Sequence, residues 1–135
     1  MKKRILVVDD EPAIGKVLRL KLSLAGYDVA TTTSGAEAIQ LVRAREPDIL
    51  LLDVMMPGVS GLDVLEGVRG FSRIPIIVFT GRDDMVRFAK KLGANDCIGK
   101  PFDPDRLVEK CRQVLAGSMG VEEKGAEQKD NTSGG

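Results

Sequence analysis

The stretch Ile49-Leu50-Leu51-Leu52-Asp53-Val54-Met55-Met56-Pro57-Gly58 decides the fold. Four consecutive aliphatic residues are typical of a strand that is buried on both faces, as in a parallel sheet. The apolar run ends at Asp53, and a buried carboxylate needs partners. Asp53 could simply cap the following loop, or it could belong to a site at the carboxyl edge of an open sheet, where such folds bind ligands.

A second acidic cluster favours the site. The apolar run Ile5-Leu6-Val7-Val8 ends in Asp9-Asp10-Glu11. If the two strands are neighbours, several carboxylates lie close together, and each close pair repels by roughly 4 kcal/mol at an effective dielectric constant of ~20. The chain has no His and only two Cys. A soft-metal site is therefore poorly supplied, whereas an all-oxygen cluster suits Mg²⁺.

Two further predicted strands also end in polar groups. Ile76-Ile77-Val78-Phe79 leads into Thr80-Gly81, and Cys97-Ile98-Gly99 leads into Lys100-Pro101. The four strand ends thus combine a carboxylate acceptor, acids for a divalent cation, a hydroxyl, an unobstructed backbone amide and an ammonium. Together these groups make a site for a phosphoryl group.

The motifs resemble those of receiver domains of bacterial two-component response regulators. The matching residues are Asp9-Asp10, Asp53 with Met55-Met56-Pro57-Gly58 and Gly61, Thr80-Gly81, Gly93-Ala94-Asn95-Asp96, and Lys100-Pro101-Phe102. The resemblance covers about residues 3–116. It implies a flavodoxin-like α/β fold, a three-layer (βα)5 sandwich around a parallel five-stranded sheet of order 2-1-3-4-5. It also implies a cis peptide bond between Lys100 and Pro101.

The resemblance also implies a role for each site residue. Asp53 would accept a phosphoryl group from a phosphohistidine on a sensor histidine kinase or a histidine phosphotransfer protein. Asp10, Asp53 and the Met55 carbonyl would bind Mg²⁺ or Mn²⁺, with Asp9 acting through water. Contacts to the phosphoryl group would come from Lys100, the Thr80 hydroxyl, and the amides of Met55 and Gly81.

One position departs from the family and bears on signal output. Many receivers carry Tyr or Phe three residues before the Lys, and that ring turns inward when the Thr hydroxyl moves onto the phosphoryl group. Here the position is Cys97, which has no ring, so movement of Thr80 would have to act through backbone shifts or other side chains.

The fourth helix, last strand and fifth helix would form a mixed-charge face suited to a homodimer or another partner, although solvation alone explains most such charges. Its charged residues are Arg87, Lys90, Lys91, Asp105, Arg106, Glu109, Lys110 and Arg112.

Three other classes of protein share parts of this pattern. A Mg²⁺-dependent phosphohydrolase with an Asp nucleophile usually has a second acid two residues later, where this chain has Met55. A nucleotide or flavin binder needs a phosphate-binding loop after the first strand, where Asp9-Asp10-Glu11 would repel phosphate. A pseudo-receiver would lack part of the site. We therefore expect a signalling phospho-acceptor, not an enzyme beyond its own phosphorylation and autodephosphorylation.

Helical patterns fill the intervals between the strands. Ser34 and Glu37 have the spacing of a capping box. The first helix has apolar residues Ile14, Val17, Leu18, Leu22 and Ala25 on one face, widened by Leu20 and Leu24, and the fourth has Met85, Phe88, Ala89 and Leu92. These patterns predict helices that cover both faces of the sheet.

Length and composition set the remaining expectations. Of 135 residues, 1–116 would form one receiver domain, and 117–135 would be a disordered tail or linker. Twenty basic and twenty acidic residues give zero net charge, so we expect no direct binding to nucleic acid or a membrane. The basic start lacks the long apolar run of a signal peptide, which predicts a cytoplasmic protein. Cys97 and Cys111 are expected to be reduced core residues.

Overall fold

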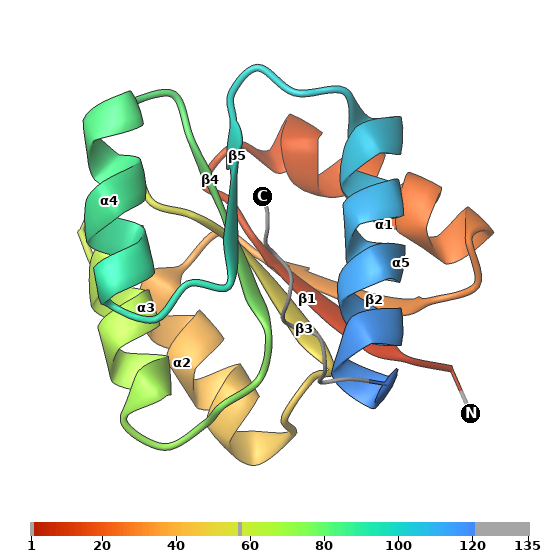
Figure 1. Ribbon diagram of the computed structural model, residues 1–135, viewed down its shortest axis with the longest axis horizontal. Helices are drawn as coiled ribbons and strands as arrows, with labels where there is room; N and C mark the ends of the chain where they lie inside the picture. Colours follow the sequence, from red (N-terminus) through yellow and green to blue (C-terminus); the bar gives the residue numbers. More distant parts are fainter. Residues whose placement is uncertain (1, 57, 121–135) are drawn as a thin grey trace.

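Five strands alternate with five helices in the computed structural model, which describes residues 2–56 and 58–120 (Figure 1). The strands are β1 (Arg4–Val8), β2 (Asp28–Thr32), β3 (Ile49–Asp53), β4 (Ile76–Thr80) and β5 (Asp96–Gly99). The helices are α1 (Pro12–Leu24), α2 (Gly35–Ala44), α3 (Gly61–Arg69), α4 (Asp83–Lys91) and α5 (Pro104–Gly120).

The strands form one parallel sheet in the order β2-β1-β3-β4-β5. The predicted fold class and strand order are confirmed. Val8 pairs with Leu52, Asp53 with Phe79, and Thr80 with Gly99. Four strands therefore end at the same edge of the sheet, around the point between β1 and β3 where the strand order reverses.

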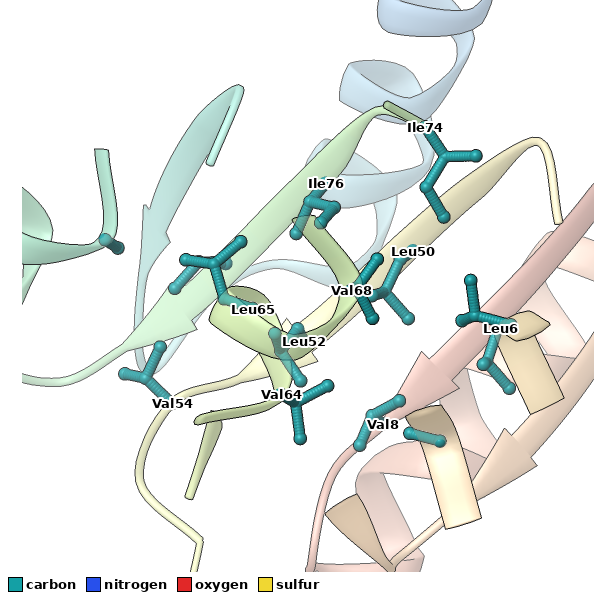
Figure 2. Packing of buried hydrophobic residues seen from close by; sticks show 14 of the residues in the cluster. Leu6, Val8, Leu50, Leu52, Val54, Val64, Leu65, Val68, Ile74 and Ile76 are labelled. Carbon is teal, nitrogen blue, oxygen red and sulfur yellow. The ribbon is translucent and has the colours of Figure 1, made fainter. Parts of the chain in front are cut away.

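The sheet is covered on both faces, because alternate strand residues point to opposite sides. One apolar cluster joins Leu6, Leu50 and Ile76 to α2, α3 and α4, and the other joins Ile5, Leu51 and Ile77 to α1 and α5. Figure 2 shows the first cluster, in which residues of α3 lie over β3 and β4. All five residues of β3 are buried, as its run of aliphatic residues predicts.

Two helices expose apolar residues that the sequence pattern places in the core. On α1, Val17, Leu20 and Leu24 are 43%, 60% and 78% exposed, and on α4, Phe88 is 58% exposed. The predicted faces were too wide, because each helix touches the sheet along a narrower stripe. That stripe includes Leu18 and Leu22 on α1, and on α4 it includes buried Ala89 with partly buried Met85 and Leu92 packed against the core.

The start of α2 is capped differently from the predicted capping box. Ser34 Oγ accepts a hydrogen bond from the Glu37 amide at 3.1 Å, which is the expected first half. The Glu37 carboxylate, however, accepts from the Thr32 hydroxyl, and the Ser34 amide donates to Thr32 Oγ1 at 3.1 Å. Thr32 therefore replaces the second half of the box.

Helix α5 runs to Gly120, beyond the predicted domain boundary at residue 116. The boundary was placed at Gly117, but one glycine costs a helix only about 1 kcal/mol relative to alanine. Buried Leu107, Cys111 and Leu115 hold α5 against the sheet. The rest of the predicted tail, residues 121–135, lies outside the described residues, as does Pro57. Within residues 2–56 and 58–120, no helix is long and apolar enough to cross a membrane.

Candidate functional site

The carboxyl edge of the sheet contains an open cleft of about 500 Å³. It is lined by Asp10, Glu11, Asp53, Met55, Gly81, Arg82 and Lys100. Residues from four separate strand ends thus meet in one place, as expected for a sheet of this order. The cleft includes Arg82, which the sequence reasoning did not select although it directly follows Thr80-Gly81.

Three carboxylates form the acidic side of the site. Asp9, Asp10 and Asp53 each place one oxygen within 4.8 Å of the others. Asp9 and Asp53 are buried, and Asp10 is partly exposed. Within the described part of the chain, the buried Asp9 Oδ2 makes no hydrogen bond and has only an ion pair with Lys100. An all-oxygen donor set with an unsatisfied buried oxygen fits a hard divalent cation such as Mg²⁺.

Lys100 is shared among three carboxylates. Its Nζ lies 3.0 Å from Asp9 Oδ2, 3.2 Å from Asp53 Oδ2 and 3.3 Å from Glu11 Oε1. Burial lowers the pKa of Lys100, but the neighbouring Asp9 and Asp53 outweigh this effect and leave the pKa above its usual value. The Lys100 amide donates to the Thr80 carbonyl at 2.9 Å, and the Lys100–Pro101 peptide bond is cis.

Asp53 is held at both carboxylate oxygens. Oδ1 accepts a hydrogen bond from the Met55 amide at 3.0 Å, while Oδ2 faces Lys100. Burial raises the pKa of Asp53 from 3.8 to about 6, helped by the charge of Asp9 and opposed by the Met55 amide and Lys100. The pKa remains raised although Lys100 is close, because burial is the largest effect and outweighs the opposing Met55 amide and Lys100.

The Thr80 hydroxyl lies at the end of β4, where it bonds to the backbone of Arg82 and, within the described residues, makes no hydrogen bond to the carboxylates. Thr80 Oγ1 donates to the Arg82 carbonyl at 3.3 Å and accepts from the Arg82 amide at 3.0 Å. Arg82 is the N-cap residue of α4. The hydroxyl is therefore engaged with the start of α4.

Close backbone packing holds the segment after Asp53. A Cβ atom on Gly61 would lie 2.1 Å from the Asp53 carbonyl oxygen and 2.3 Å from the Val54 Cα, so only glycine fits there. Gly81 is different, because its nearest contact for a Cβ, the Lys100 carbonyl, is an ordinary 3.7 Å away. The protein itself thus leaves room at Gly81.

Cys97 is part of β5, and its side chain lies against α4. Its Sγ is 4.0 Å from the Val86 carbonyl, and burial raises its pKa. Cys111 is fully buried, which raises its pKa to about 12. Both cysteines are free thiols, as predicted.

Half of the predicted mixed-charge face is already paired within the chain. Asp105 pairs with Lys21 at 2.9 Å, Lys110 with Asp96 at 2.7 Å, and Glu109 with Arg112. No ion pair in the described ranges involves the other four residues, Arg87, Lys90, Lys91 and Arg106. The four unpaired residues among these eight are therefore all basic.

The sheet order and the acidic cleft at its switch point together define a CheY-like receiver domain. The sequence agrees: residues 5–112 match the family described as "Response regulator receiver domain". This chain belongs to that family and is a receiver domain of two-component signalling systems, which confirms the predicted family.

Individual relatives support the same assignment. The chain is 41% identical over 117 residues to "DNA-binding response regulator MtrA" of Mycolicibacterium smegmatis, covering 85% of this chain and 51% of MtrA. A chain of Chloroflexus aurantiacus described as a response regulator has a TM-score of 0.81 at 34% identity, with 87% of this chain and 100% of that chain covered.

A more distant structure has the same fold. A CheY-like receiver domain protein of Methanospirillum hungatei also reaches a TM-score of 0.81, at 28% identity, covering 86% of this chain and 95% of that one. The chain spans about half the length of the curated relatives it matches.

Proposed function

We propose that Asp53 accepts a phosphoryl group from a phosphohistidine partner, and that the resulting change at the carboxyl edge of the sheet signals downstream. The observation that carries the proposal is the position of the Asp53 carboxylate. It lies in an open cleft, held by the Met55 amide and Lys100, beside Asp9 and Asp10.

In the proposed transfer, an Asp53 carboxylate oxygen attacks phosphorus and forms a P–O bond. The N–P bond of the donor breaks, and the imidazole nitrogen leaves with the electron pair. Catalysis of this step consists mainly of aligning the reactants and stabilising charge on the phosphoryl oxygens. Lys100, the Thr80 hydroxyl and the amides of Met55 and Gly81 would supply that stabilisation.

A divalent cation, Mg²⁺ or Mn²⁺, belongs to this proposal. Asp10, Asp53 and the Met55 carbonyl would hold it directly, and Asp9 would act through water. When bound, it would neutralise charge on the phosphoryl oxygens. Support comes from the acid cluster, because Asp9, Asp10, Glu11 and Asp53 outnumber the basic residues of the cleft, Lys100 and Arg82, and Arg82 is paired with Asp84.

Intact mass tests the acceptor role. The wild type incubated with acetyl phosphate and Mg²⁺ should gain one phosphoryl group, and Asp53→Asn should gain none. A gain that persists in Asp53→Asn and maps to Asp9 or Asp10 would contradict the assignment. No gain in the wild type would indicate a pseudo-receiver, and rapid turnover of acetyl phosphate would favour the phosphohydrolase alternative.

The surface beside Lys100 supports a docking site for the phosphohistidine donor. An apolar groove of about 540 Å³ runs along α1 next to the cleft, lined by Glu11, Ala13, Ile14, Val17, Leu18, Lys100, Pro101, Phe102 and Pro104. Exposed Val17 and Leu20 extend the apolar surface. A donor bound in this groove would lie next to the cleft that contains Asp53. Such a docking site accounts for the exposure of apolar residues that do not pack in the core.

Substitution on α1 separates docking from chemistry. Val17→Glu should slow transfer from an autophosphorylated sensor kinase that phosphorylates the wild type, by about tenfold or more. Phosphorylation by acetyl phosphate, which needs no docking surface, should be unchanged. Equal loss with both donors would show that the substitution damages the site and not an interface.

For output, we propose a conformational switch and no enzymatic activity beyond the domain's own phosphorylation and dephosphorylation. The curated relative MtrA is named a DNA-binding regulator, which supports an effector acting on transcription. A homodimer through α4, β5 and α5 stays a prediction. Within the described residues, unpaired Arg87, Lys90, Lys91 and Arg106 outnumber unpaired Asp83 on this face, which favours an acidic partner surface over a second copy.

A further inference from the structure

The first turn of α2 lies between the two segments that carry the acids. On one side, the hydroxyl of Thr32, the last residue of β2, bonds to this turn, and the Thr32 carbonyl accepts the Asp9 amide at 3.2 Å. On the other side, Gly35 lies against Val59 in the loop between β3 and α3, residues 54–60. This turn therefore contacts the loop after Asp53 directly and is connected to the backbone of Asp9 through Thr32.

The contact at Gly35 is too close for any side chain. A Cβ atom there would lie 2.6 Å from the Val59 carbonyl oxygen and 2.9 Å from Val64 Cγ2. Gly35 is not among the described glycines with positive φ, which are Gly26, Gly58 and Gly93. Its backbone angles therefore suit any residue, and glycine is required only because the loop lies so near.

A displacement of Val59 would be transmitted to Asp53. Gly61, two residues further on, lies directly against the Asp53–Val54 peptide, and its amide donates to the Val54 carbonyl at 3.3 Å. Val54 and Met56 are buried in the core, so the 54–60 loop cannot move freely away from the sheet. Met55 lies between them, lines the cleft and binds Asp53 Oδ1 through its amide.

Thr32 connects the same turn to the other acid. Its hydroxyl accepts from the Ser34 amide and donates to the Glu37 carboxylate, which holds the start of α2. Its carbonyl accepts the Asp9 amide. Thr32 is 7% exposed, so these bonds are shielded from water. One residue thus orders both the α2 turn and the backbone of Asp9.

We propose that Gly35 and Thr32 are positioning residues of the site: through the 54–60 loop and the Asp9 amide, they set the spacing between the metal-binding acids. The inference rests on the proposed function, since it concerns the affinity of the same site. It assigns a role in the site to α2, which contributes no residue to the cleft.

Alanine substitution tests this role with a matched glycine control. In Gly35→Ala, the new methyl group would overlap the Val59 carbonyl, so the backbone around Val59 must shift, and the Kd for Mg²⁺ should rise by about tenfold or more, as for other residues that orient metal ligands. In Gly15→Ala, the methyl group would meet Thr31 Cβ at an ordinary 3.8 Å, and the Kd should be unchanged. Isothermal titration calorimetry with MgCl₂ measures both.

NMR of the metal-free protein distinguishes positioning from general destabilisation. Gly35→Ala should shift the amides of Asp53 and Met55, while those of Gly99 and Lys100 should stay in place. A purely structural role would lower the melting temperature and perturb only the neighbours of residue 35, with no change in Kd. That result would overturn the inference.

A second variant keeps the test decisive if Gly35→Ala does not fold. Thr32→Val removes the hydroxyl but keeps the carbonyl, so the α2 turn loosens while the shape is preserved. It should weaken Mg²⁺ binding and shift the Asp9 and Met55 amides, and wild-type affinity would overturn the inference. If the wild type itself binds no Mg²⁺, the proposed function fails, whereas the metal-free amide shifts still test the positioning contacts.

Discussion

At the residue scale, the electrostatics of the site depend on Lys100. Its ammonium lies within 3.3 Å of Asp9, Asp53 and Glu11. Arg82, the other basic residue that lines the cleft, pairs with Asp84 at 2.8 Å, so Lys100 is the cation that these carboxylates share. The pKa of Asp53 is raised because its burial outweighs the opposing effects of the Met55 amide and Lys100.

Lys100→Met should affect metal binding and phosphorylation in opposite directions. Removing the positive charge leaves the acids more negative, so Mg²⁺ should bind several-fold more tightly, an effect of roughly 1 kcal/mol. Phosphorylation by acetyl phosphate should slow by about 100-fold, because a donor to the phosphoryl oxygens is lost. Calorimetry and intact mass measure the two effects.

The matched control for this prediction is Lys110→Met. Lys110 also forms an ion pair at short range, with Asp96 at 2.7 Å, but it does not line the cleft. Both readouts should equal those of the wild type. If Lys100→Met instead weakened Mg²⁺ binding, Lys100 would be organising the acids more than it competes with the cation.

The raised pKa of Asp53 predicts a pH dependence of stability in EDTA. The folded state favours protonated Asp53. The stability that this protonation contributes is therefore fully present below pH 3.8 and is lost as the pH rises through about 6. The free energy of unfolding should fall by roughly 2 to 3 kcal/mol over this range. Urea unfolding of Asp53→Asn, which has no carboxyl group here, should lack this decline. An equal decline in both proteins would assign it to other acids.

At the element scale, the end of β4 is joined to the start of α4. The Thr80 hydroxyl exchanges hydrogen bonds with the backbone of Arg82, the N-cap of α4. For the hydroxyl to donate to a phosphoryl group, its bond to the Arg82 carbonyl must break. The start of α4 would then lose a contact directly, without any aromatic side chain at Cys97.

This link predicts which backbone amides a bound phosphoryl analogue will perturb. With beryllofluoride and Mg²⁺, the amides of Met55, Thr80, Gly81 and Arg82 should shift strongly in NMR spectra. Those of Cys97 and the body of α4 should shift less, because a thiol cannot follow Thr80 as a ring does. Cys97→Tyr should enlarge the response of α4, and Cys97→Ser should not. Shifts at Cys97 as large as those at Gly81 in the wild type would contradict this.

At the scale of the whole molecule, the carboxyl edge of the sheet concentrates repulsion that the rest of the fold must offset. Two buried cores hold the strands in register on both faces, and that register brings Asp9, Asp10 and Asp53 together. Because close carboxylates repel, the metal-free domain is less stable than its packing would allow. A cation that relieves the repulsion should stabilise the entire fold.

Mg²⁺ should therefore raise the melting temperature, with a gain of roughly 2.7 kcal/mol at a hundredfold excess over Kd. Asp10→Asn should melt higher than the wild type in EDTA and respond less to Mg²⁺. Asp28→Asn, at the opposite edge of the sheet where β2 begins, should behave as the wild type in both respects. No change with millimolar Mg²⁺ in the wild type would contradict the proposed metal site.

Local patterns were enough to predict the sheet and the residues at its carboxyl edge. The apolar run before Asp53 specifies a strand buried on both faces, because side-chain burial follows the pattern of successive residues. An apolar run, or its final glycine, is directly followed by Asp9, Asp53, Thr80 and Lys100, and Asp10 comes one residue later. Their convergence then needs only parallel strands, while the strand order came from the family resemblance.

Contacts between distant segments were decided only by the tertiary structure. Three examples are the sharing of Lys100, the bond from Thr80 to Arg82, and the contact of Gly35 with Val59. Each depends on how closely two elements pack, which local sequence patterns do not specify. So does the exposure of Leu20 on α1, because a helical pattern does not tell how wide a stripe the sheet will cover. The sequence by itself determined which groups reach the site, since strand ends are local features. Packing between elements determined how those groups are paired and held.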